Sequence, residues 1–320
     1  MWKIRIDEDQ PLLGTLGESN SQLCTFTRQT TCETMAPSCP SQKNHNMLTA
    51  LFDLLAISLY LIAGILLVRR LFNIPTTVGS ELYIKWAVLS LAAGAATLHG
   101  ALLYSTLWVS DGLNLGLNSA ASLMAWAIVV LFLIIAVFKA VENLGVIILP
   151  TAALAVLLAW LWPGQHLLLP QVSAVLLSHL VVAFLAYSLL ALALVQALVL
   201  WWQERRLHQQ HSGRALRTMP PIQTMEKFLF GLIGTGFVLL TLTLISGTLF
   251  SEAIFGKPLI ISHHIVLSLI GWGIFAILLF GHWRFGWRGR HAVRWTVGGF
   301  ALLLLGYFGS KFVLEILLNR

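Results

Sequence analysis

From residue 48 onward the chain is a series of apolar runs with few charges, each close to the ~20 residues that an α-helix needs to cross a lipid bilayer. Runs of this length without polar–apolar alternation predict helices, because only helices and closed barrels satisfy every backbone polar group in lipid. The predicted fold class is all-α, a polytopic integral membrane bundle of about eight transmembrane helices. We expect the spans at about residues 48–68, 84–105, 119–138, 145–162, 172–201, 228–250, 260–281 and 294–318.

The composition also indicates a membrane protein. Of the 320 residues, 58% are hydrophobic and 10% are charged, whereas soluble domains carry about 25% charged residues. The formal net charge is +7, but no basic face with stacking aromatic residues lies outside the apolar runs. We therefore assign the basic residues to cytoplasmic loops, and we expect the lipid bilayer, and no nucleic acid, as a partner.

Residues 1–46 differ from the rest, because they are polar, rich in Ser and Thr, and lack the apolar core of a signal peptide. We expect a disordered tail, or a start codon assigned too early, with Met47 as the true start. All three cysteines lie here beside His45, but their spacing matches no closed zinc site. Residues 47–320 form the predicted transmembrane domain.

Lys and Arg alternate between the loops that join the spans. The odd-numbered loops carry them, the second and fourth loops have none, and the sixth has only Lys257. Cytoplasmic loops of membrane proteins are enriched in Lys and Arg, so the odd loops are predicted to be cytoplasmic. Both termini of the helical domain would then lie on the outer side of the membrane.

Ionisable side chains inside spanning helices are energetically costly, so each one is a candidate functional group. His99 and His179 lie in the second and fifth spans, both roughly 9–12 Å below the outer surface at ~1.5 Å per residue. Two neutral imidazoles at one depth on different helices can ligate a haem iron from both faces. The other interpretation is that each histidine forms hydrogen bonds between helices.

Three more histidines lie at span ends. His263 and His264 begin the seventh span at the outer surface. They are interpreted either as solvated interfacial residues or as contacts for haem propionates or outer ligands. His282 ends the same span within "GHWRFGWRGRH", where Trp and Arg are typical of a cytoplasmic membrane interface. No nucleophile triad, P-loop or HExxH pattern occurs in the sequence, and we do not expect an enzyme.

Three stretches resemble motifs of the cytochrome c assembly, or haem-handling, membrane proteins: "GTGFVLLTLTLISGTLF", "SHLVVAFLAYSLLAL", and the segment around "GHWRFGWRGRH" with the helix after it. Within that family, "LHGALLY" and "GLNLGLNSAASLMAWAI" are similar to the YpjD-type inner-membrane proteins, relatives of CcsA, CcmC and HemX. The residues that carry the match are Gly236, Phe237, Leu240, Thr241, Gly247, His179, Tyr187, His282, Gly286, Trp287, Arg288, Gly289, Tyr307, Phe308 and Gly309.

The resemblance covers about residues 47–320. It implies non-covalent binding of haem b by transmembrane and outer-facing histidines, in a bacterial inner membrane, for delivery of haem to apocytochrome c in the periplasm. His179 matches an outer-side haem histidine, His282 matches a transmembrane haem histidine, and His99 matches a position of the subgroup. The implied partners are haem and cytochrome c maturation components.

The sequence also departs from the family pattern. The family's Trp-rich loop, which presents haem, is replaced between the sixth and seventh spans by "SEAIFGKPLIIS", and the second outer histidine is missing. The sequence therefore favours haem binding over a complete cytochrome c synthetase. The alternatives are a HemX-like membrane adaptor or regulator without haem turnover, and a small-solute transporter.

Overall fold

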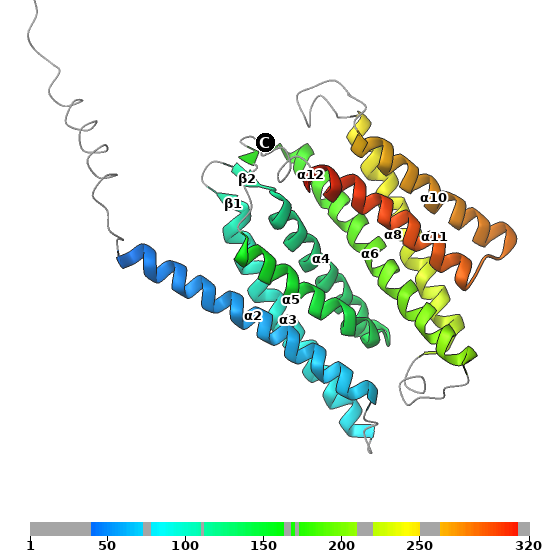
Figure 1. Cartoon of the computed structure of the whole chain (residues 1–320), viewed down its shortest axis with the longest axis horizontal. Helices are drawn as coiled ribbons and strands as arrows, with labels where there is room; N and C mark the ends of the chain where they lie inside the picture. The colour runs from blue at the N-terminus through cyan, green and yellow to red at the C-terminus, as the bar shows by residue number, and fades with distance from the viewer. Residues whose placement is uncertain are drawn as a thin grey trace, which may run out of the picture. The chain divides into compact units, whose positions relative to one another are not determined.

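The chain divides into two compact units, residues 1–48 and 49–320, and the packing described below concerns the second unit. Residues 1–39 of the predicted tail lie outside the described part of the chain. The backbone of residues 40–46, which we also expected to belong to the tail, is helical. Figure 1 shows the computed structural model of the chain, which describes residues 40–72, 78–109, 112–162, 168–169, 173–209, 220–249 and 263–312.

Eight helical segments among the described residues are long and apolar enough to cross a membrane, which confirms the predicted all-α bundle. The last of them continues from α11 through the π-helical turn η2 into α12. The helices are α2 (Pro40–Phe72), α3 (Val78–Leu107), α4 (Leu117–Phe138), η1 (Glu142–Leu144), α5 (Gly145–Leu161), α6 (Ala174–His208), α8 (Ile222–Leu249), α10 (His263–Phe285), α11 (Arg290–Leu304), η2 (Leu305–Gly309) and α12 (Ser310–Phe312).

The end of the bundle at which α6 and α10 begin is called the outer end, following the predicted topology, and the opposite end the cytoplasmic end. Three very short strands, which we did not predict, lie at the outer end. β1 (Trp108–Val109) pairs with β2 (Gly112–Asn114), and β2 pairs with β3 (Leu168–Leu169), all antiparallel. They connect the loops around α3, α4 and α6 through backbone hydrogen bonds.

α6 is longer than its predicted span, since it continues past residue 201 to His208. The added turns contain Gln, Glu and Arg, which form helices readily in water and do not need a lipid environment. α10 likewise continues past residue 281 to Phe285. Both helices therefore extend beyond their apolar runs at the cytoplasmic end.

α6 is the central helix of the bundle. It packs along α8 and also contacts α4 and α11, while α10 packs on α11 and α8, and α3 and α5 pack on α4 (Figure 1). On the other side of α4, Gly64 of α2 faces Pro150 of α5. A Cβ added to Gly64 would lie 3.6 Å from the Pro150 ring. The bundle thus has helices on both sides of α6.

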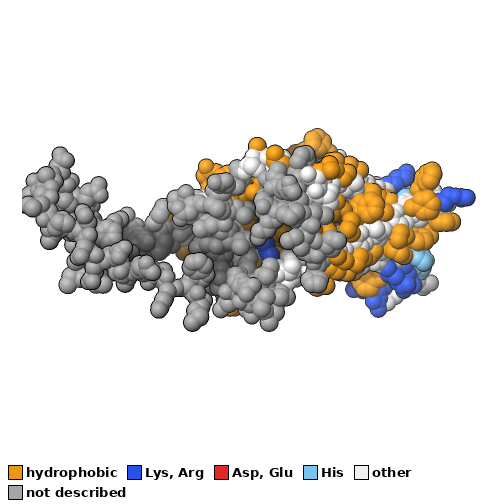
Figure 2. Space-filling view, turned by 90° about the horizontal axis from the view of Figure 1, so that it is seen from above, with side chains coloured by type: hydrophobic (Ala, Val, Ile, Leu, Met, Phe, Trp, Pro, Cys, Tyr) orange, Lys and Arg blue, Asp and Glu red, His pale blue; other side chains and the backbone are white. Residues whose placement is uncertain are grey.

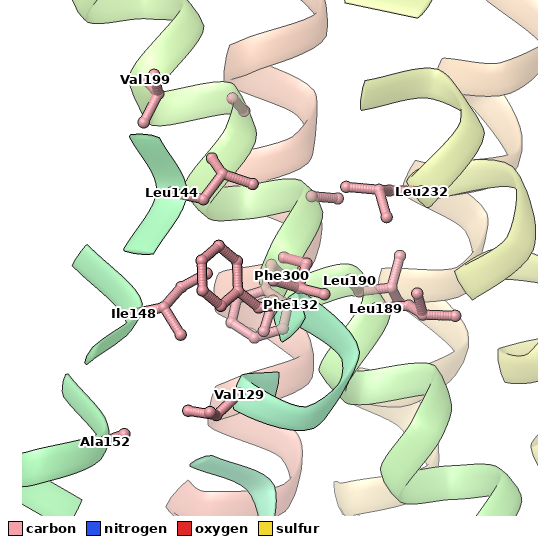
Figure 3. Packing of buried hydrophobic residues seen from close by; sticks show 14 of the residues in the cluster. Val129, Phe132, Leu144, Ile148, Ala152, Leu189, Leu190, Val199, Leu232 and Phe300 are labelled. Atoms are coloured by element: carbon pink, nitrogen blue, oxygen red, sulfur yellow. The ribbon is translucent and has the colours of Figure 1, made fainter. Parts of the chain in front are cut away.

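The core is a single large cluster of apolar side chains that joins the helices around α6. Figure 3 shows Phe132 of α4, Ile148 of α5, Leu190 of α6 and Phe300 of α11 packed together, and each is at most 4% exposed. Lipid chains are as apolar as these side chains, so close van der Waals packing holds such helices together in a membrane.

The outward faces of the helices are apolar as well. Large side chains such as Phe138 and Leu249 are 82% and 72% exposed, and hydrophobic atoms cover most of the described surface in Figure 2. A continuous surface of this kind is stable against lipid chains. Lys, Arg and His side chains gather at one end in the same view, as expected for a membrane interface.

α8 approaches α6 closely at one glycine of the sequence "GLIGTG". A Cβ added to Gly236 would lie 2.8 Å from the Leu190 side chain, whereas Gly231 and Gly234 have no atom within 4 Å of such a Cβ. Of the three glycines in this sequence, Gly236 alone therefore makes a close helix contact. The absence of a side chain at this position sets the spacing between α6 and α8.

We predict that Gly236→Leu destabilises the protein by about 1–3 kcal/mol, because the added side chain overpacks the contact with Leu190. Gly231→Leu is the matched control, since it adds the same side chain to the same helix in open space. Thermal unfolding in detergent, followed by tryptophan fluorescence, measures both. Equal midpoints for the two variants would contradict this account of the α6–α8 contact.

Candidate functional site

The five predicted site histidines lie in three places. His99 is in α3, enclosed by α2 and α4. His179 of α6 and His264 of α10 lie near the outer end, close enough for their imidazoles to interact electrostatically. His282 lies near the other end of α10. His263 is the first residue of α10, and its side chain lies outside the described part of the structure.

His99 links three helices through hydrogen bonds. Its Nδ1 lies 3.3 Å from the Tyr60 hydroxyl of α2, and its Nε2 lies 2.9 Å from the Ser122 hydroxyl of α4. All three side chains are at most 2% exposed. One ring nitrogen of a neutral imidazole donates and the other accepts, so both are used here. These contacts favour the interhelical interpretation of His99, because an iron atom would have to displace one hydroxyl.

His179 is oriented by α8. Its Nδ1 lies 2.8 Å from the Ser246 hydroxyl, and that hydroxyl donates its own hydrogen to the Thr243 carbonyl at 3.1 Å. With the Ser246 hydrogen directed to the Thr243 carbonyl, the His179 Nδ1–H is the donor to Ser246. The neutral tautomer then carries its lone pair on Nε2, which is the arrangement that second-shell hydrogen bonds give to metal-binding histidines.

An aromatic cluster adjoins the two outer histidines. The Tyr307 ring lies 6.2 Å from the His264 ring, measured between centroids, and 6.0 Å and 6.4 Å from the rings of Tyr187 and Phe184 on α6. The Lys311 ammonium group lies 5.5 Å from the centre of the Tyr307 ring. Among the described residues, the outer end therefore brings together two imidazoles, an aromatic cluster and the Lys311 cation, which are the kinds of group that contact a planar apolar ligand with anionic groups.

Tyr307 lies in the π-helical turn η2 of the last span. π-helical turns are rare and often occur at functional sites. Gly306 precedes Tyr307 in this turn, and a Cβ added there would lie 3.2 Å from Leu267 of α10. The turn thus packs directly on α10, one helical turn after His264.

His282 is oriented by the loop that follows it. Its Nδ1 lies 2.9 Å from the Trp287 carbonyl oxygen, which can only accept, so Nδ1 carries the hydrogen. The Phe230 ring of α8 stacks on the imidazole with centroids 3.5 Å apart and an interplanar angle of 13°. His282 therefore has the same tautomer as His179, with the lone pair on Nε2.

Three glycines give this loop its shape. Gly286 and Gly289 have φ angles of 67° and 53°, a left-handed region that glycine adopts without strain. A Cβ added to Gly281 would lie 2.4 Å from the Trp287 ring, so only glycine lets that ring pack on α10. The stretch "GHWRFGWRGRH" thus contains the end of α10, a compact hairpin of residues 286–289 and the start of α11.

The site residues that the sequence did not reveal include Tyr60 and Ser122 beside His99 and the partners on α8. Ser246 is a hydroxyl within an apolar run, which was the only available signal. Glu226 and Phe230 lie at the start of α8, and Glu226 precedes residue 228, where the sixth span was predicted to begin. Their roles depend on which helix face meets α10, and sequence periodicity does not reveal this in a helix that is apolar on all sides.

The described residues offer few ligands for a bare metal ion. No group of three or more His, Cys, Asp or Glu side chains gathers within the part of the chain that the structure describes. A structural zinc ion needs four protein ligands. Haem supplies its own macrocycle, so the protein needs only one or two axial ligands.

Known proteins resemble this chain over much of its transmembrane domain. A family model described as Cytochrome C assembly protein matches residues 86–318. The chain is 31% identical over 235 residues to inner membrane protein YpjD of Escherichia coli K12, covering 72% of this chain and 86% of the relative. It is 23% identical over 137 residues to protein HemX of Brevibacillus brevis (43% and 50% covered) and 31% identical over 104 residues to cytochrome c biogenesis protein CcsA of Gloeobacter violaceus (32% and 31%).

We predict that His99→Phe destabilises the protein by about 1–3 kcal/mol, because it leaves the buried hydroxyls of Tyr60 and Ser122 without their partner. Removing those hydroxyls as well, in the triple variant with Tyr60→Phe and Ser122→Ala, should restore part of the loss. Thermal unfolding in detergent compares the two. A triple variant less stable than the single one would show that the hydrogen-bond network is not the cause.

Proposed function

Because the chain belongs to the cytochrome c assembly protein family, we propose that this multi-pass inner-membrane protein binds haem b non-covalently and serves cytochrome c assembly or haem handling. In this proposal the protein ligates and orients the haem and excludes competing ligands, and it is not an enzyme. Cytochrome c maturation components are the proposed partners.

The observation that carries the proposal is the orientation of His179. Ser246 takes its Nδ1–H, so the lone pair lies on Nε2, and His264 of α10 lies at the same end of the bundle. We propose His179 and His264 as the axial ligands, with Tyr307 against the macrocycle and Lys311 near the propionates. His263, next to His264, is proposed to contact the propionates from the outer surface.

His99 and His282 are the other proposed ligands. Pairing of His179 with His99 would require iron to displace the Ser122 or Tyr60 hydroxyl, so it is the less favoured arrangement. His282 is proposed as a transmembrane ligand at the cytoplasmic end. Its Nδ1–H is already bound to a carbonyl oxygen, as in many metal-binding histidines.

A HemX-like adaptor without haem turnover is the second candidate function. It is favoured by one specific feature, the segment "SEAIFGKPLIIS", which has no Trp where the family has its haem-presenting loop. An adaptor would keep the helix packing described above and would use it to bind a partner protein. Haem content decides between the two functions.

We predict that the protein, expressed with ample haem and purified in detergent, shows a Soret band and a positive pyridine haemochrome assay. His179→Ala should lose the outer haem, and Ser246→Ala should weaken its affinity roughly 10–100-fold, as loss of a second-shell partner typically does. His208→Ala, an exposed histidine on the same helix, is the control and should retain haem. A wild-type protein without a Soret band would refute the haem proposal and leave the adaptor.

The proposed topology places the odd-numbered loops in the cytoplasm and both termini of the helical domain in the periplasm. In a variant without the native cysteines, Ser251→Cys should react with a membrane-impermeant maleimide in intact spheroplasts. Ser212→Cys, in the Arg-rich fifth loop, should react only after lysis. The reverse labelling pattern would invert the topology and place His179 near the cytoplasm.

A further inference from the structure

α8 contacts the hairpin of residues 286–289 through Glu226. One carboxylate oxygen of Glu226 accepts a hydrogen bond from the Gly289 backbone N–H at 2.8 Å. Gly289 is the residue before α11, and it has no side chain to cap that helix. The amino end of a helix carries partial positive charge, so a carboxylate from a neighbouring helix is favourable there. Glu226 thus acts as the missing cap and joins α8 to the hairpin.

A second carboxylate faces the same point. Glu204 of α6 lies so near that a Cβ added to Gly289 would be 2.8 Å from its Oε1, and its charge interacts with those of Glu226 and Arg290. Glu226 repels the Glu204 carboxylate and Arg290 attracts it, whereas Glu226 makes the backbone hydrogen bond to Gly289. Substituting Glu204 and Glu226 in turn therefore tests which of the two carboxylates positions the hairpin.

The position of the Trp287 carbonyl depends on how the hairpin is held. Trp287 lies between Gly286 and Gly289, both in left-handed conformations, and glycine has the greatest backbone freedom of all residues. The Gly286 N–H donates to the His282 carbonyl at 3.1 Å and the Trp287 N–H donates to the Gly281 carbonyl at 3.2 Å, so these bonds hold the hairpin up to the Trp287 nitrogen, and the Trp287 carbonyl lies beyond them. The hydrogen bond from Gly289 to Glu226 fixes its other end.

The same helix holds the imidazole itself. Phe230, which stacks on His282, follows Glu226 by four residues and so lies on the same face of α8. α8 therefore contacts the His282 ring through Phe230 and, through Glu226, the hairpin that carries the Trp287 carbonyl.

We propose that Glu226 is a positioning residue for His282: by capping α11 at Gly289 it holds the Trp287 carbonyl on Nδ1 and presents Nε2 as a ligand for iron. The identity of the ligand, haem iron, rests on the proposed function. The contacts of Glu226 with Gly289 and of His282 with Trp287 do not depend on that function.

The test that does not depend on haem is nitrogen magnetic resonance of the full-length protein with ¹⁵N-labelled histidine. The His282 signals are identified by their loss in His282→Asn. We expect wild type to show a protonated Nδ1 and an unprotonated Nε2, and Glu226→Ala to show exchange between tautomers. Glu226→Gln keeps an acceptor oxygen and should restore the wild-type signals. Glu204→Gln is the matched control and should leave them unchanged.

The second test measures haem in the same variants. Where wild type binds haem at the cytoplasmic end, Glu226→Ala should lower the affinity there roughly 10–100-fold while the haem bound at His179 is retained. Wild type without haem would refute the proposed function, and the nitrogen spectrum would still decide the role of Glu226. Identical His282 signals in Glu226→Ala and wild type would overturn the inference. If Glu226→Ala does not fold, Glu226→Met removes the acceptor while preserving side-chain length.

Discussion

The packing of α6 against α8 is the contact on which both ends of the molecule depend. Gly236 lets the two helices approach closely near their middle, and Gln196 of α6 donates a hydrogen bond to the Met225 carbonyl of α8 at 3.1 Å. In a membrane, where the hydrophobic effect does not drive helices together, such close approach and interhelical hydrogen bonds determine the arrangement. A shift of α8 along α6 would therefore displace Ser246 at one end and Glu226 at the other.

α8 itself contributes no histidine, yet it orients two of them. Ser246 fixes the tautomer of His179, and Phe230 with Glu226 fixes the ring and the acceptor of His282. His99, by contrast, is held by hydroxyls from α2 and α4. The three sites share one principle. A polar side chain at membrane depth is acceptable because another helix satisfies its hydrogen-bonding groups.

The sequence predicted the helices well and the contacts between them poorly, for a physical reason. The length of an apolar run indicates a membrane span, so eight spans could be located from the apolar runs of the sequence. Position within a span is also readable, which is why His99 and His179 were both predicted to lie inside membrane helices. Their different partners were not, because helices that are apolar on every side have no periodic polar face to indicate their neighbours. The π-helical turn at Tyr307 is likewise set by packing on α10, which no local pattern records.

In the proposed function, α6 and α8 together present a histidine to haem iron. Electron paramagnetic resonance of the haem-loaded, oxidised protein, with and without ¹⁵N-labelled histidine, tests it most directly. In a His282→Asn background, which removes the proposed cytoplasmic ligand, we expect hyperfine coupling between iron and an imidazole nitrogen that changes on labelling and disappears in His179→Ala. Haem bound with no histidine coupling, or coupling that persists unchanged without His179, would contradict this ligation.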